Sequence, residues 1–169
     1  AMAVHFNPAM RVEAEEYGDA VLTRWPERLI RAAALPTVAG IPGLEPRGAL
    51  WVAIELHGAV LNVINTHLGL VPREQRLQAA ALAGRDWLGH PDCVGPTILA
   101  GDFNATSITR PYATLTRRLA DAQRVLGLRP TVKTFPSSFP AIRIDHAFVS
   151  PEIRVIRAQA PFSPLARMA

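Results

Sequence analysis

The stretch TILAGDFN, residues 97–104, joins a short apolar run to a polar end. The run over 97–100 predicts a buried strand, and Gly101 followed by Asp102 marks where the chain leaves the sheet. In open α/β sheets, ligands bind at that end of a strand. Asp102 and Asn104 would project from the same face of an extended segment, where a carboxylate can take a proton from water and an amide can hold an oxygen. The alternative is a plain turn, because Asp and Asn favour turns through local hydrogen bonds.

A second polar cluster ends a predicted hairpin. Strands are expected over 50–57 and 60–66, joined by a turn at Gly58, and the motif NTH at 65–67 closes the second strand. The imidazole of His67 can donate a hydrogen bond to a phosphoryl oxygen. A lone His is more often structural, so both interpretations stay open here.

A third cluster, RIDH at 143–146, opens a predicted strand over 143–149. Strand alternation places Asp145 and His146 on opposite faces, so a given pocket can receive one of them and not both. A structural pair of Asp145 with an Arg or a His is the alternative to a role in the site.

The clearest helix is predicted over 72–90, where Pro72 suits the first helical position and Gly89 with Pro91 ends the helix. We expect Glu74, Gln78 and Arg85 to lie off its apolar face. That face is predicted from residues at helical spacing, namely Leu77, Ala80, Ala81, Gly84, Trp87 and Leu88.

The other predicted elements are mostly strands, at 19–24, 29–35, 131–135 and 153–159, with a loop over 36–48 and a weaker helix over 111–126. Many strands joined by hairpins, with helices between some of them, predict an α/β sandwich with mixed sheets.

These segments in this order resemble the endonuclease/exonuclease/phosphatase superfamily, the DNase I-like fold, over nearly the whole chain. The resemblance rests on YGDAVLTRWP at 17–26, NTHL at 65–68, the spacing of Arg76, Gln78 and Leu82, GDFNA at 101–105, and RIDHAFVS at 143–150. It implies an α/β, DNase I-like two-sheet sandwich with flanking helices, here incomplete, with the site at the sheet ends. It also implies a hydrolase of phosphate esters that depends on Mg²⁺ or Mn²⁺.

The resemblance also implies roles for single residues. His67 would contact the scissile phosphate, Asp102 would orient or deprotonate the attacking water, and Asn104 would position that water. Asp145 would orient a catalytic His that comes from elsewhere. Mg²⁺ takes hard oxygen ligands and neutralises charge on a phosphoryl group, which suits such a site. The predicted set is His67, Asp102, Asn104 and Asp145 for catalysis, Asp102 and Asn104 as metal ligands, and Tyr17 and Arg143 for substrate binding.

The sequence departs from the family pattern at three places. The resemblance assigns a metal-binding Glu to a strand before Tyr17, and we expect no such strand in residues 1–16. It assigns a catalytic His to a Ser-Asp-His motif, which is absent from the sequence, and Asp19 replaces the usual Asn. We therefore interpret residues 1–169 as a single domain, truncated at both ends, with little or no catalysis of its own. Exposed strand edges would favour a dimer.

Composition limits the remaining alternatives. An apolar fraction of 49% and a charged fraction of 19% exclude a disordered chain. The 18 basic residues exceed the 14 acidic ones, but the arginines are scattered and form no nucleic-acid patch. The partner that the resemblance implies is a phosphate-ester substrate, with nucleic acid, a lipid head group and a small phosphodiester all open. A non-catalytic binding module that keeps the sandwich, and a DNA-binding protein without chemistry, are the other classes.

Cysteine and hydropathy bear on location. Cys93 is the single cysteine in the sequence, which excludes an internal disulfide and a Cys-based zinc site. No stretch approaches the ~20 apolar residues that span a bilayer. We expect a cytoplasmic location, and secretion stays open.

Overall fold

The computed structural model describes residues 1–161 and 163. A two-stranded sheet, β1–β2, faces a six-stranded sheet with the order β3-β4-β5-β6-β8-β7. The strands are β1 (Ala3–Val12), β2 (Glu15–Thr23), β3 (Glu27–Ala34), β4 (Gly48–Leu56), β5 (Ala59–His67), β6 (Thr97–Asp102), β7 (Ala120–Asp121) and β8 (Asp145–Val149). The helices are α1 (Pro72–Ala83), α2 (Arg110–Leu115) and α3 (Ala122–Val125). The predicted mixed α/β architecture with two sheets is confirmed.

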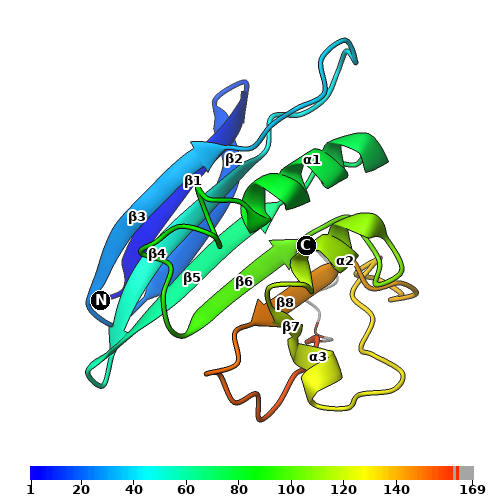
Figure 1. Cartoon of the computed structure of the whole chain (residues 1–169). Helices are drawn as coiled ribbons and strands as arrows, with labels where there is room; N and C mark the ends of the chain where they lie inside the picture. The colour runs from blue at the N-terminus through cyan, green and yellow to red at the C-terminus, as the bar shows by residue number, and fades with distance from the viewer. Residues whose placement is uncertain (162, 164–169) are drawn as a thin grey trace.

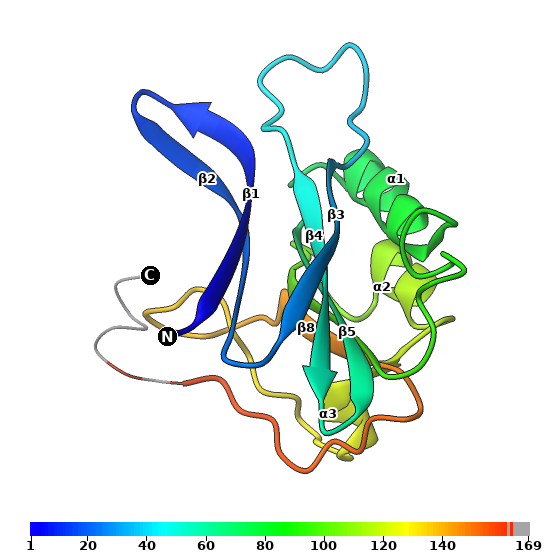
Figure 2. The same ribbon diagram turned by 90° about the vertical axis from the view of Figure 1, so that its left-hand side faces the viewer.

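The larger sheet is covered on both faces. In Figures 1 and 2, the β1–β2 hairpin lies on one side of the sheet, and α1 and α2 lie on the other. Strand β4 shows why, because nearly all of it is buried and its side chains alternate between two cores. Trp51 packs into the cluster on the helix side, whereas Leu50 and Val52 pack into the cluster beneath the hairpin.

The strand directions bring several loops to one edge of the sheet. β5 and β6 run parallel, so their carboxyl ends lie together, and the antiparallel strands β4 and β8 begin at the same edge. Gly101 permits this pairing. Its φ is +147°, and a Cβ atom there would come within 1.8 Å of the carbonyl oxygen of Thr66.

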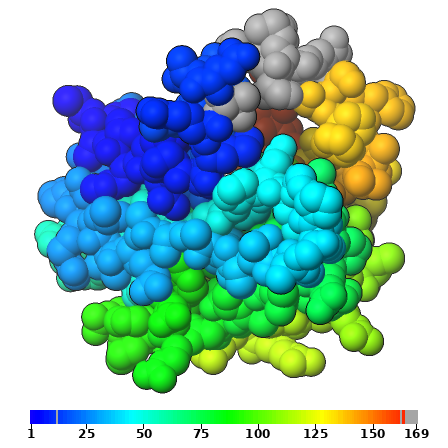
Figure 3. All heavy atoms as spheres, turned by 90° about the horizontal axis from the view of Figure 1, so that it is seen from above, coloured from blue at the N-terminus to red at the C-terminus, as the bar shows by residue number. Residues whose placement is uncertain are grey.

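The edge is visible from above. In Figure 3, the N-terminal hairpin in blue, the loop before β4 in light blue to cyan, and residues 130–142 in orange lie around the same face of the molecule.

Helix α1 corrects two predictions. It ends at Ala83 rather than at residue 90, and the following residues form tight turns in which the backbone N–H of Gly89 donates to the Gly84 carbonyl. The predicted apolar face is also wrong, since Leu77 is 43% exposed while Gln78 is fully buried. The physical reason is hydrogen bonding, because the buried Gln78 side chain accepts from the backbone N–H of Gly69 at 2.8 Å.

Two of the predicted strands do not form in the described residues. Residues 131–135 contribute a single bridge, between Phe135 and Ile142, and 153–159 are irregular in the described structure. The segment 111–126 divides into α2 and α3, with β7 between them.

The region before Tyr17 also differs from expectation. Residues 3–12 form β1, which pairs antiparallel with β2. Glu13, Glu15 and Glu16 follow β1 at the turn and at the start of β2, and all three are exposed. No helix in the described part of the chain is long and apolar enough to cross a bilayer.

Candidate active site

Three of the predicted residues meet where β5 and β6 end. His67 closes β5, Asp102 closes β6, and Asn104 follows two residues later. The Nε2 atom of His67 lies 3.6 Å from Asp102 Oδ2 and 3.1 Å from Asn104 Nδ2. The parallel register pairs His67 directly with Asp102, which is why the two side chains converge.

Asn104 reaches this position through a local turn. Its backbone N–H donates to Asp102 Oδ1 at 2.8 Å, and its φ of +47° lies in the left-handed region that Asn tolerates. The turn considered as an alternative from the sequence therefore forms. The turn brings the Asn104 side chain next to His67, so the turn is part of the site.

Several contacts hold the turn in place. Asn104 Nδ2 donates to the Leu68 carbonyl at 2.9 Å, and Gln75 Nε2 donates to the Asn104 carbonyl at 2.8 Å. The His146 ring bonds through Nε2 to the Ala105 carbonyl at 2.7 Å. His146 is buried, so it supports the loop from the core and leaves its strand neighbour Asp145 on the exposed face, as alternation predicts.

The local electrostatics shift the pKa of two site residues. Burial raises the pKa of Asp102, although the Asn104 backbone hydrogen bond and His67 act in the opposite direction. Burial lowers the pKa of His67, and the Arg47 guanidinium lowers it further. Asp145 pairs with Asp102 across the β6–β8 ladder, and its charge also raises the pKa of Asp102.

Arg47 is a site residue that motif reading did not single out. Its Nη1 lies 3.2 Å from His67 Nδ1, and its Nη2 donates to Glu45 Oε2 at 2.6 Å. A signal existed in the predicted hairpin. Ala49 pairs with Thr66, so continuing the β4–β5 register by one pair places Gly48 opposite His67 and Arg47 next to that pair.

Tyr17 and Arg143 have different surroundings. Tyr17 lines a small cavity of about 240 Å³ together with Asp19, Arg47 and His67, and it donates to Glu15 at 2.5 Å. Arg143 was predicted to bind substrate, but its guanidinium is buried and donates to Asp121 Oδ2 at 2.6 Å. The structure thus places Tyr17 at the site and directs Arg143 into the core.

Asp19 is the most unusual residue of the small cavity. It is buried, and its Oδ2 has no hydrogen-bond partner among the described residues. Desolvation raises the pKa of Asp19 to about 7, although the positive charge of Arg47 acts to lower it.

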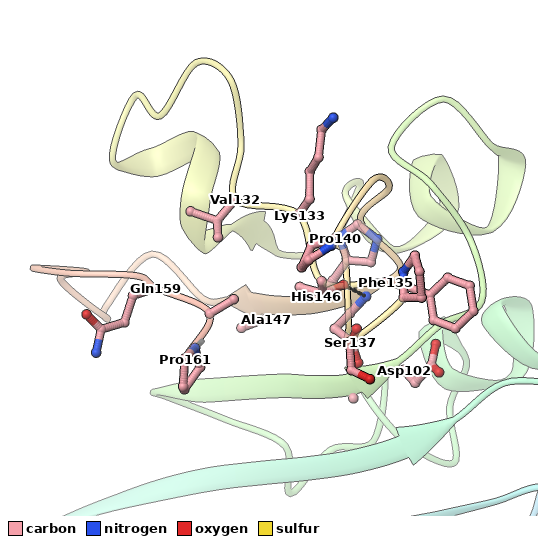
Figure 4. Close-up of a pocket in the computed structure, with 15 residues that line it drawn as sticks. Asp102, Val132, Lys133, Phe135, Ser137, Pro140, His146, Ala147, Gln159 and Pro161 are labelled. Carbon is pink, nitrogen blue, oxygen red and sulfur yellow. Dashed lines mark hydrogen bonds between the residues drawn. The ribbon is translucent and has the colours of Figure 1, made fainter. Parts of the chain in front are cut away.

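A larger cleft of about 1010 Å³ opens on the other side of Asp102. In Figure 4, Phe135 and Ser137 lie on the side of Asp102, and Gln159 and Pro161 lie toward the opposite end. Aromatic and proline side chains line much of this cleft, with the carboxylates of Asp102 and Asp145 also facing it. His67 therefore lines the small cavity, whereas Asp102 and Asp145 line the large cleft.

The donor set fits a hard divalent cation. Asp102 supplies carboxylate oxygens, and the side-chain amide of Asn104 directs its nitrogen to Leu68, which leaves its oxygen free to coordinate. In the described residues, no group of three or more His, Cys, Asp or Glu side chains lies close enough to hold a metal. A metal here would therefore keep water or substrate oxygens among its ligands.

Comparisons with known proteins agree with this geometry. The family model of the endonuclease/exonuclease/phosphatase family matches residues 4–167, and the chain belongs to this family. YbhP of Escherichia coli strain K12, an uncharacterised protein, is 28% identical over 135 residues, which are 79% of this chain and 51% of that protein. The chain thus spans about half the length of the curated relatives that it matches.

Solved structures share the fold at low sequence identity. An endonuclease/exonuclease/phosphatase from Bacteroides vulgatus has a TM-score of 0.67 at 20% identity, covering 89% of this chain and 65% of its own. The human nocturnin catalytic domain with a bound sulfate anion has a TM-score of 0.66 at 19% identity, covering 89% and 61%. The predicted DNase I-like fold and family are therefore confirmed.

Proposed function

We propose that this site hydrolyses phosphate ester bonds with the help of a divalent metal ion, Mg²⁺ or Mn²⁺. The observation that carries the proposal is the convergence of His67, Asp102 and Asn104 at the carboxyl ends of two parallel strands. Membership of a family of phosphoesterases supports the class of reaction.

In this proposal, the three side chains have different roles. His67, whose ring is half-exposed, donates a hydrogen bond to a phosphoryl oxygen. Asp102 orients the attacking water and takes its proton, and the raised pKa of this carboxylate suits a base. Asn104 positions the same water. Asp102 and Asn104 would hold the metal, which would neutralise charge on the phosphoryl group.

Two other predicted residues take supporting roles. Asp145 would orient a catalytic His that comes from elsewhere. Tyr17 would contact the substrate from the small cavity. Arg143 acts through the fold, because its guanidinium is buried against Asp121.

We infer that the 169-residue chain turns substrate over slowly. The sequence contains neither the Ser-Asp-His motif nor the metal-binding Glu motif of the resemblance. A non-catalytic binding module is the second candidate, because the fold can bind a phosphate group through His67 and Asn104 without hydrolysing it.

Hydrolysis of bis-p-nitrophenyl phosphate tests the proposal. We expect a slow rate that requires Mg²⁺ or Mn²⁺, stops with EDTA, and falls at least about a hundredfold in Asp102→Asn, because the general base is lost. Asp92→Asn, an exposed Asp remote in sequence from the motifs, is the matched control. A rate that is insensitive to EDTA or to Asp102→Asn would refute the hydrolase, and a rapid rate would refute the slow turnover.

A further inference from the structure

The Arg47 guanidinium lies against one ring nitrogen of His67. The Arg47 side chain is 10% exposed, and its guanidinium joins Glu45 through Nη2 and His67 Nδ1 through Nη1. A guanidinium always carries its charge and has N–H donors with no acceptor. The contact with His67 therefore requires a lone pair on Nδ1, and the neutral ring then holds its proton on Nε2.

Asn104 faces that proton with a second donor. Its Nδ2 lies 3.1 Å from His67 Nε2 and also donates to the Leu68 carbonyl at 2.9 Å. Rotating the amide by 180° would place Oδ1 against the carbonyl oxygen of Leu68, so the contact with Leu68 fixes the amide orientation. Two N–H donors thus lie side by side and cannot satisfy each other, and the carboxylate atom Asp102 Oδ2 lies 3.6 Å from His67 Nε2, beyond hydrogen-bond distance.

Resting on the phosphoesterase function proposed above, we propose that Arg47 is a positioning residue. It holds His67 in the Nε2–H tautomer, so that His67 and Asn104 donate together to one oxygen of a phosphoryl group. An anionic oxygen that bridges the two nitrogens resolves the conflict between the two donors. The Nδ1 lone pair is occupied by Arg47, so His67 acts as a hydrogen-bond donor and not as the proton source for the leaving group.

The backbone around Arg47 is anchored well enough for this task. The Arg47 carbonyl accepts from the Leu35 N–H at 2.7 Å, and the Gly48 carbonyl accepts from Thr66 Oγ1 at 2.8 Å. A Cβ at Gly48 would lie 2.7 Å from Asn7 Nδ2, so the N-terminal hairpin packs directly on this segment. These contacts tie Arg47 to the strand that ends at His67.

The experiment is long-range ¹H–¹⁵N NMR of the His67 ring in the full 169-residue chain, at a mildly alkaline pH. We expect the wild type to show one tautomer, with the proton on Nε2. Arg47→Met removes the donor to Nδ1, so both tautomers should be populated. Arg28→Met, an exposed arginine on β3, is the matched control and should leave the tautomer unchanged.

A proton on Nδ1 in the wild type would overturn the proposal, as would an unchanged tautomer in a folded Arg47→Met variant. If Arg47→Met fails to fold, the wild-type spectrum can still overturn the proposal, because a proton on Nδ1 is incompatible with the Arg47 contact. Titration with inorganic phosphate and Mg²⁺ separates this proposal from the proposed function. A shift of the Nε2 resonance supports both the role of Arg47 and phosphate binding. If the Nε2–H tautomer is present but its resonance does not shift, the role of Arg47 stands and phosphate binding at this site is contradicted.

Discussion

Asp19 shows what a single buried side chain contributes to stability. Its Oδ2 lacks a partner among the described residues, and burial raises its pKa from 3.8 to about 7. In the unfolded chain this carboxyl ionises near pH 4, whereas in the folded chain it stays protonated up to about pH 7. The free energy of unfolding should therefore fall as the pH rises through this window.

Asp19→Asn tests that pH dependence. The variant should lose the decline between about pH 4 and 7, and above pH 7 it should be more stable than the wild type by on the order of 3 kcal/mol. Urea unfolding at several pH values measures this difference, with Glu16→Gln on the exposed part of β2 as the control. If the two profiles run parallel, Asp19 is not the source of the pH dependence.

Three of the residues that the motifs single out combine suitable chemistry with a position at the end of a strand. His67, Asp102 and Asn104 each follow an apolar strand, and the structure brings them together. Arg47 lies in a loop between Pro and Gly residues, so no periodicity marked it. Arg143 lies in a recognised motif, but its burial against Asp121 depends on β7 and α3, which the sequence did not predict.

Among the elements, α1 shows why polarity alone misleads. Its buried face carries Glu74, Gln75 and Gln78. Gln75 and Gln78 bind the loop that leads from His67, and Glu74 accepts from Thr37 Oγ1 at 2.9 Å. A hydrophobic pattern assigns polar residues to solvent. Here the two glutamines are buried because the loop backbone offers donors and acceptors to them.

Two single substitutions on α1 test whether its buried face is the polar one of the structure or the apolar one that the sequence pattern predicts. Gln78→Ala leaves the buried N–H of Gly69 without its acceptor and should cost about 2 kcal/mol of unfolding free energy. Leu77→Ala, at an exposed position, should change stability by less than about 0.5 kcal/mol. Chemical denaturation of both variants provides the measurement, and a larger loss from Leu77→Ala would restore the sequence-based prediction.

A buried polar cluster joins β7, α2 and β8. Asp121 accepts from Tyr112 at 2.7 Å and from Arg143 at 2.6 Å. Burial acts to raise the pKa of Asp121, but interactions with His146, Tyr112 and Arg143 outweigh it and hold the pKa below its usual range. These residues lie behind the loop that carries Asn104, because His146 also bonds to Ala105.

Asp121→Ala should therefore destabilise the protein by on the order of 3 kcal/mol, since it leaves the Arg143 charge buried without its partner. Asp92→Ala, at a 78% exposed side chain, is the control and should be neutral. Urea melts followed by circular dichroism give both values. Equal midpoints for the two variants would show that the cluster is not a structural support.

At the scale of the whole molecule, the strands at the edge of the large sheet and in the small sheet leave apolar side chains exposed. β3 is an edge strand of the large sheet, and the small sheet has two strands. Apolar side chains on these strands are exposed, namely Val4, Phe6, Leu22 and Leu29. The alternating strand pattern predicted the sandwich. It could not predict β1, because an Asn and a Pro interrupt the alternation of apolar residues there. It also could not predict that a single bridge replaces the strand expected over 131–135.

We propose that these edges let two copies of the chain associate. The average mass in sedimentation equilibrium should rise with protein concentration, and Leu29→Lys on β3 should reduce the association, because an edge charge opposes strand pairing. Arg28→Lys on the same strand is the control. A constant monomer mass at every concentration would contradict the dimer.

The central claim is that the ends of β5 and β6 form a phosphoester site. The most direct test is a crystal structure of the chain grown with Mn²⁺ and inorganic phosphate. We expect an anomalous Mn²⁺ peak at Asp102 and Asn104, with a phosphate oxygen between His67 Nε2 and Asn104 Nδ2. Phosphate and Mn²⁺ bound elsewhere, with these side chains contacting neither, would contradict it.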